Sequence, residues 1–160
     1  MSGALAVLVL ATAVGAACTG GALYAFSSFV MPALERLPAA QAVAAMQSIN
    51  VTAVRAPFML AFAGTAVLSV AVIVVALTRL DRSYAPWLLI GAALYLVGVF
   101  GVTMGYHVPR NDALDRLVAD APGTAEAWKT YLSEWTTANH VRAAAGLLAA
   151  AALGIAVRVG

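Results

Sequence analysis

Two histidines, His107 and His140, are the only side chains of the chain whose ordinary titration range includes neutral pH. Each lies in a short polar stretch beside a long apolar run, where it could accept a proton from a weak acid or bind a metal ion. The Cys, Asp or Glu spacing that accompanies histidines in metal sites is missing from the sequence. The two histidines are therefore either hydrogen-bonded residues at the membrane interface or groups for acid–base chemistry. We expect no cofactor, with a metal or haem at His107 and His140 as the alternative.

A second group of residues forms a stripe along the last apolar segment, within an arc of about 80° on a helical wheel. Its members are Trp128, Tyr131, Trp135, Asn139, Arg142 and Gly146. One interpretation is an aromatic belt at the membrane interface, with Arg142 extended toward the lipid headgroups. The other is the lining of a cavity between helices, because Asn and Arg are costly to expose to lipid. The two interpretations are compatible, and His140 lies about 100° away from the stripe.

The third apolar run ends in another polar group, Thr103, Tyr106 and His107, which lie near one helix face. The opposite face carries the glycines Gly98, Gly101 and Gly105. Glycines at this spacing allow two helices to approach closely, so this face predicts a helix–helix seam. Asn111 follows Pro109, and it either caps the next short helix or belongs to a site.

These residues belong to a chain whose composition is that of an integral membrane protein. Of its 160 residues, 63% are hydrophobic and only 10% are charged, and the mean hydropathy is +0.92. A soluble domain needs far more surface charge, and a disordered chain is poor in apolar residues, so both classes are excluded. The net charge of +2 is spread too thinly to form a nucleic-acid surface. A single cysteine, Cys18, excludes an intramolecular disulfide.

Charge-free runs predict four membrane spans at about residues 4–31, 57–78, 84–108 and 139–158. We expect a single integral membrane domain over residues 1–160, an all-α four-helix transmembrane bundle. Two longer, partly helical loops should lie on one membrane face. The first run predicts a span rather than a cleaved signal peptide, because no Lys or Arg precedes it and it continues well past Cys18.

The orientation in the membrane depends on a nearly balanced count of basic residues. The side with the long loops holds six basic residues, and the side with the termini holds three. The counts become four and three once Arg55 and Arg142 are set aside as facing the bundle. The long loops also carry six acids. The raw count favours cytoplasmic long loops, but the corrected count is nearly balanced. We expect a bacterial-type plasma membrane, with cytoplasmic termini.

Several of these motifs together resemble the anthrone oxygenase-like family of small four-span membrane proteins, most of which have no assigned function. The marks are SSFVMPAL at 27–34, MQSIN at 46–50, PF at 57–58, Thr103 with HVPRNDAL at 107–114, and WTTANHVR at 135–142. In the family pattern an asparagine often stands where this chain has His107. The resemblance implies oxidation of anthrones to anthraquinones with molecular oxygen, the reaction of the characterised fungal relatives.

The resemblance suggests an oxygenase in which a base removes a proton from a hydrophobic aromatic substrate and the carbanion reacts with O2 as co-substrate. The hypothesis makes His140 the base, with Arg142, Asn139 and Asn111 as catalytic hydrogen-bond donors to the developing oxyanion. The residues expected to bind the substrate are Trp135, Thr103, His107, Asn50 and Tyr131.

The alternative is a non-catalytic membrane protein that binds a lipid, a quinone or a hydrophobic metabolite, or that serves as a structural partner subunit. The polar residues would then form a network that ties the loops to the spans. In either case the expected partners are the lipid bilayer and a hydrophobic small molecule, with a homo-oligomer possible and no nucleic acid.

Overall fold

The computed structural model describes residues 1–160, apart from the side chain of Ala56. The described chain is helical without strands, and four of its helical rods are long and apolar enough to cross a membrane. The predicted all-α four-helix transmembrane bundle, with two longer, partly helical connections on one side, is therefore confirmed. The protein is an integral membrane protein.

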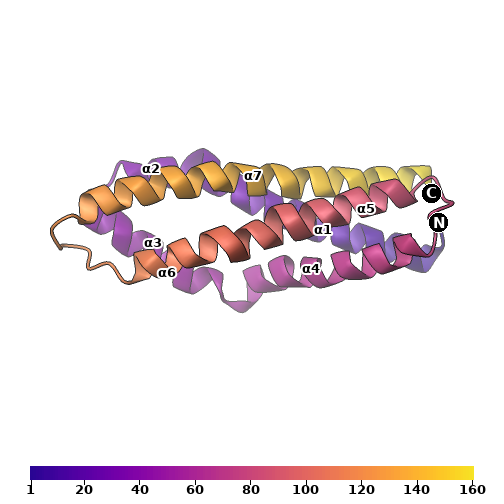
Figure 1. Ribbon diagram of the computed structural model, residues 1–160, viewed down its shortest axis with the longest axis horizontal. Coiled ribbons are helices and arrows are strands. Elements are labelled where there is room, and N and C mark those ends of the chain that lie inside the picture. Colours follow the sequence, from indigo (N-terminus) through magenta and orange to yellow (C-terminus); the bar gives the residue numbers. More distant parts are fainter.

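The four rods are built from successive helical segments. The first comprises α1 (Gly3–Ala25), η1 (Phe26–Val30) and α2 (Met31–Glu35), and α3 (Ala39–Ala53) leads from it into the second rod, α4 (Ala56–Leu77). The third comprises α5 (Ala85–Ala93), η2 (Leu94–Gly101), η3 (Thr103–His107) and α6 (Val108–Asp115), and α7 (Thr124–Val159) is the fourth. Figure 1 shows them side by side in an elongated bundle with both termini at one end and the α6–α7 connection at the other.

Helix α7 is longer than a membrane is thick, and this length creates a cap outside the bilayer. Its 36 residues extend about 54 Å at 1.5 Å per residue, against a hydrocarbon core of about 30 Å. Gly123, at φ 88°, adopts the left-handed conformation that sets the direction of the chain just before the helix. The first turns of α7 pack on α2, α3 and α6 through a cluster that includes Met31, Met46 and Trp128.

The half of the bundle near the termini is closed by small residues. A Cβ atom on Gly20 of α1 would lie 2.9 Å from the backbone nitrogen of Leu147 on α7, so these two helices touch through their backbones. The glycine seam predicted on the third rod is only partly correct. Gly98 contacts Ala145, but Gly101 and Gly105 are exposed, and a Cβ atom on Gly105 would meet open space.

The other half is interrupted by π-helical turns. They occur in the first rod at η1 and in the third rod at η2 and η3. A π turn changes the phase of the side chains and frees carbonyl groups from the regular α-helical pattern, and such turns are frequent at functional sites. Both interrupted rods face the middle of α7, where the polar residues lie.

Candidate functional site

Arg142 is the centre of a buried polar cluster on α7. Its side chain is only 4% exposed, so the sequence interpretation in which it extends toward the lipid headgroups is wrong. One terminal nitrogen donates to the Thr103 hydroxyl at 3.1 Å, and the other donates to Oδ1 of Asn139 at 2.6 Å. The guanidinium carbon lies 5.1 Å from the centre of the Trp135 ring. The stripe therefore faces the interior of the bundle, where the guanidinium lies between helices.

The charge of Arg142 has no acidic counterpart nearby. Within the part of the chain that the structure describes, no carboxylate lies within 4.0 Å of this guanidinium, and its Nε has no hydrogen-bond partner. A buried charge normally has a partner of opposite sign, because desolvation is costly. Arg110 provides the contrast, since its Nε donates to Glu134 at 3.0 Å near the surface.

Asn139 links Arg142 to the first rod. Its Nδ2 donates to the Leu23 carbonyl and to the Ser27 hydroxyl, both at 2.7 Å. The Ser27 hydroxyl belongs to the π segment of that rod, and the Leu23 carbonyl lies just before it. With both amide hydrogens directed to α1 and η1, Oδ1 is oriented toward the Arg142 guanidinium, so Asn139 fixes how the arginine lies.

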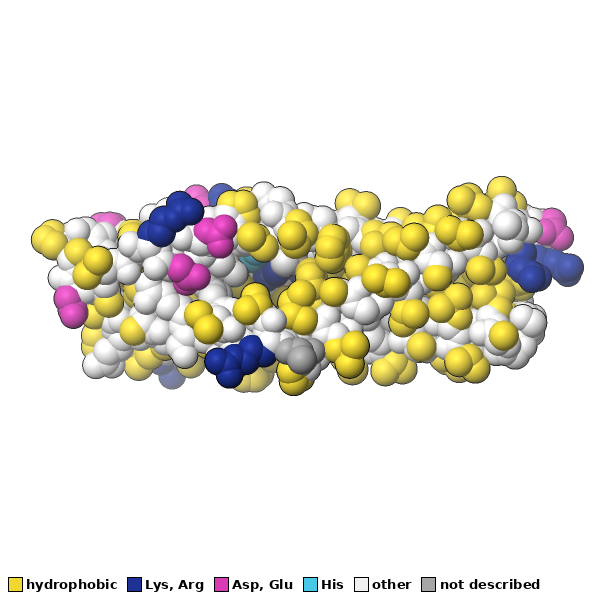
Figure 2. Space-filling model, turned by 90° about the horizontal axis from the view of Figure 1, so that it is seen from below, with side chains coloured by type: hydrophobic (Ala, Val, Ile, Leu, Met, Phe, Trp, Pro, Cys, Tyr) yellow, Lys and Arg dark blue, Asp and Glu magenta, His cyan; other side chains and the backbone are white. Residues whose placement is uncertain are grey.

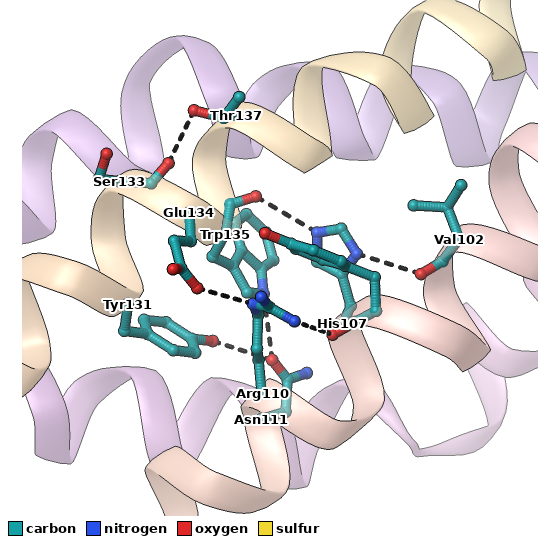
Figure 3. Close-up of polar contacts among 10 residues, drawn as sticks. Val102, His107, Arg110, Asn111, Tyr131, Ser133, Glu134, Trp135 and Thr137 are labelled. Atoms are coloured by element: carbon teal, nitrogen blue, oxygen red, sulfur yellow. Dashed lines mark hydrogen bonds and ion pairs between the residues drawn. The ribbon is translucent and has the colours of Figure 1, made fainter.

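Asn111 links the third rod to α7. Its Oδ1 accepts hydrogen bonds from the Tyr131 hydroxyl at 2.9 Å and from Trp135 Nε1 at 3.0 Å (Figure 3). Asn111 lies inside α6, whose N-cap residue is His107, so the interpretation of Asn111 as a helix N-cap is wrong. Its side chain instead fixes the orientation of the Trp135 ring.

His107 is buried, at 1% exposure, between two backbone carbonyl groups. Its Nε2 lies 3.3 Å from the Trp135 carbonyl and its Nδ1 lies 3.5 Å from the Val102 carbonyl (Figure 3). A neutral imidazole has one N–H, so it donates to only one of them and keeps a lone pair on the other nitrogen. The ring meets the Trp135 ring edge-on, with centroids 5.1 Å apart. His107 is therefore the histidine that the fold brings to the cluster.

His140 lies outside this cluster. It is on α7 between Asn139 and Val141, and its side chain is exposed, as the wheel angle predicted. The structure thus separates the base named by the sequence hypothesis from the proposed donors. Within the described residues, no three His, Cys, Asp or Glu side chains form a group that could hold a metal ion.

The remaining predicted residues lie near the cluster. Thr103 binds Arg142, and its own hydroxyl hydrogen goes to the Val99 carbonyl at 2.6 Å. Asn50, on α3, lies beside the Tyr131 side chain, and its Nδ2 is buried without a hydrogen-bond partner. Ser27 was not among the predicted site residues, although it begins the motif at 27–34. A hydroxyl directly before an apolar helix segment was the available signal.

Apolar surfaces adjoin the cluster on two sides. A groove of about 480 Å³ lies between α7 and the third rod, lined by Val97, Gly101, Val102, Gly105, Tyr106, Ala138 and Val141. A stack of phenylalanines joins α4 to the third rod, with ring centroids 6.0 Å apart for Phe58 and Phe62 and 5.3 Å apart for Phe62 and Phe100. Phe62 packs with Leu23 and Ala143, neighbours of Asn139 and Arg142.

The molecular surface is hollowed on the face that carries α4. Figure 2 shows this hollow at the border between the apolar half and the half with charged side chains, and histidine and basic side chains are visible at its bottom. The buried cluster itself combines a cation, an imidazole and an aromatic ring, those of Arg142, His107 and Trp135.

The family comparison covers most of this site. The family model for anthrone oxygenase matches residues 58–152, a range that includes most of α4, the third rod and most of α7. Within this range lie Thr103, His107, Asn111, Trp135 and Arg142, whereas Ser27 and Asn50 precede it. No curated protein and no solved structure matches the chain. Because the family model matches more than half of the chain and includes the buried cluster, the chain belongs to the anthrone oxygenase family.

Proposed function

We propose that the protein is a membrane-embedded oxygenase that acts on flat, hydrophobic aromatic ketones of the anthrone type. The observation that carries the proposal is Arg142, a buried cation with a free Nε and without a carboxylate partner in the described structure. Such a donor stabilises negative charge that appears on a substrate oxygen during the reaction. The family membership supports the same chemistry.

The reaction begins at the acidic ring carbon of the substrate. Loss of one proton gives a carbanion whose charge is delocalised onto the ketone oxygen as an enolate. The carbanion transfers two electrons to O2 and forms a carbon–oxygen bond, which gives a hydroperoxide after protonation. Loss of water then leaves the new carbonyl group, so the substrate gains one oxygen atom and the second leaves as water. The protein must supply a base and a donor to the enolate oxygen.

The residue roles follow from the contacts. Arg142 Nε is the proposed donor to the enolate oxygen, and Thr103 and Asn139 orient it through its terminal nitrogens. His107 is the proposed base, because it is buried against the same Trp135 ring as Arg142. Its Nδ1 is the less engaged nitrogen, at 3.5 Å from the Val102 carbonyl. A hydrophobic substrate would enter from the bilayer past half-buried Phe58 and Phe100.

The test is oxygen uptake by the purified protein in an uncharged detergent, with anthrone as substrate and anthraquinone measured by its absorbance. We expect His107→Ala to lower kcat by at least about 100-fold, the usual contribution of a positioned base. His140→Ala, which changes an exposed side chain of α7, should keep most of the activity. If His140→Ala abolished turnover in a folded protein and His107→Ala did not, the base would be His140, as the sequence hypothesis has it.

The alternative of a non-catalytic binding protein is supported by a different part of the cluster. Asn139 and Asn111 direct their hydrogen bonds to other helices of the bundle, as structural links do. Under this alternative the protein would bind anthrone without consuming oxygen. An oxygen electrode together with a binding measurement on the same preparation distinguishes the two functions.

The location in the cell is part of the same proposal. We place the protein in a bacterial-type plasma membrane with both termini on the cytoplasmic side, which puts the cap formed by α2, α3, α6 and the start of α7 outside. A reporter enzyme that is active only in the cytoplasm, fused after Gly160, should then be active. Activity of the same reporter inserted after Pro122, and not after Gly160, would reverse the orientation.

A further inference from the structure

Two buried hydrogen-bond donors near Tyr131 and Arg142 have no partner. The buried side-chain atoms without a partner are Arg142 Nε, Asn50 Nδ2 and Thr136 Oγ1 within the described residues, and the first two can only donate. The two amide oxygens beside them are already occupied, since Asn139 Oδ1 binds Arg142 and Asn111 Oδ1 binds Tyr131 and Trp135. A ligand that completes this cluster must therefore accept hydrogen bonds.

The cluster also has an unbalanced charge. The titratable side chains that face Arg142 are His107 from the third rod and Tyr131 from α7, and neither is an acid that is ionised at neutral pH. Arg110, the other basic residue on this side of the third rod, is paired with Glu134. On the first rod, the groups that accept hydrogen bonds from Asn139 are the Leu23 carbonyl and the Ser27 hydroxyl, and both are neutral. A buried cation in these surroundings is stabilised most by a negative ligand.

We propose that this site holds its ligand as an anion: a flat aromatic molecule with an ionised oxygen, phenolate or enolate, which releases its proton to the solvent on binding and places that oxygen at Arg142 Nε. The inference rests on the proposed function for the position of the substrate, and it is independent of the oxygen chemistry. The Trp135 ring, whose centre lies 5.1 Å from the Arg142 guanidinium carbon, offers a flat aromatic ligand a stacking surface that a small inorganic anion would not use.

A dye reports the protonation state of the ligand directly. The probe is 2-hydroxyanthraquinone, whose visible absorption moves to longer wavelength when its phenol ionises. Its titration is measured in uncharged detergent micelles with and without the wild-type protein. We expect the bound dye to ionise at least about one pH unit lower than the dye in empty micelles, which corresponds to a tenfold preference for the anion. An unchanged or raised midpoint would overturn the proposal.

Two ligand controls and three variants locate the effect. Arg142→Gln should abolish the shift, Arg142→Lys should keep part of it, and Arg110→Gln, at the neighbouring paired arginine, should leave it unchanged. 2-Methoxyanthraquinone and unsubstituted anthraquinone cannot ionise, so their affinities should be equal in wild type and in Arg142→Gln. A shift that survives Arg142→Gln, or one that Arg110→Gln removes, would contradict the assignment to Arg142. If Arg142→Gln failed to fold, the titration midpoints of the dye with the wild type and with Arg142→Lys would test the proposal. A midpoint that Arg142→Lys left fully shifted or did not shift at all would contradict the expected partial effect.

Oxygen uptake separates this inference from the proposed oxygenase. A shifted dye midpoint without anthrone-dependent oxygen consumption would keep the anion site and reject the oxygenase. Oxygen consumption with an unshifted dye would keep the oxygenase and reject the anion site.

Discussion

Two buried polar groups, at different levels of the bundle, differ in how they are satisfied. Tyr95, in the apolar half, is fully buried, and its hydroxyl donates to the Phe62 carbonyl at 2.9 Å and lies 3.2 Å from the Thr19 hydroxyl. Arg142 is almost as deeply buried, yet it carries a charge without a nearby acid and has an unpartnered Nε. A neutral, fully bonded group is what a structural role requires, and an unsatisfied cation is what a ligand site provides.

The surrounding backbone differs in the same way. Near Gly20 and Gly146 the first rod and α7 touch through their backbones, so no side chain fits between them. Around Asn139 the same two rods are joined by a side chain that reaches a π segment. The closed contact holds the bundle together, and the more open region beyond it leaves room for polar groups. Substitutions in the two regions should therefore affect different properties.

The largest effect is expected for Arg142→Gln on activity. Loss of a donor to the developing oxyanion typically lowers kcat by about 100- to 1,000-fold, and we expect a loss in this range for anthrone oxidation. Unfolding followed by circular dichroism in detergent should show a net change of no more than about 2 kcal/mol, because the loss of two hydrogen bonds is offset by the removal of a buried charge without an acidic partner. An unfolded or strongly destabilised variant would mean that Arg142, like Tyr95, is a structural group.

Gly20→Ala should have the largest effect on stability. The new Cβ atom would lie 2.9 Å from the Leu147 backbone nitrogen, and neither backbone can move without separating the helices. Overpacking of this kind costs about 1–3 kcal/mol, which should appear as a lower melting temperature. The melting temperature of Gly3→Ala, where nothing lies within 4 Å of the Cβ position, serves as the control. Equal stability of the two variants would show that the α1–α7 contact is not tight.

The fold was predictable from the sequence because hydropathy and charge decide where a chain crosses a membrane. Arg79 and Arg82 mark the turn between two spans, and the proline at position 57 marks the beginning of another. The buried stripe from Trp128 to Gly146 was also predictable, since one continuous helix places residues of known spacing on one face. These inferences needed only the geometry of a single regular helix.

The partners of the stripe were not predictable, because they depend on irregular backbone in other rods. The π turns of the third rod change its helical phase, so the wheel that placed Gly101 and Gly105 at a seam used the wrong period. The same irregularity brings the Val102 carbonyl to His107. Ser27 meets Asn139 across 112 positions of sequence, a separation at which spacing carries no information.

Tyr95→Phe tests the structural member of the comparison. The variant has no hydroxyl group to donate to the Phe62 carbonyl or to contact the Thr19 hydroxyl. Both groups then stay buried without their tyrosine partner, which should lower the free energy of unfolding by about 1–2 kcal/mol. Anthrone-dependent oxygen uptake, measured below the melting temperature, should remain within about twofold of wild type, because the Tyr95 hydroxyl bonds to Phe62 and Thr19 and to none of the residues that hold Arg142. A large loss of activity with unchanged stability would place Tyr95 in the reacting site.

The smallest effect is expected for Gly105→Ala, on the exposed face of the third rod. Its Cβ atom meets no atom within 4 Å, so the substitution adds helix propensity without a clash and should stabilise the protein by at most about 1 kcal/mol. Gly98→Ala, two seam positions earlier on the same rod, is the matched comparison, because its Cβ atom would collide with Ala145. Destabilisation by Gly105→Ala would mean that another helix occupies this face in the membrane. In that case the apolar groove beside α7 would be a contact between copies of the chain.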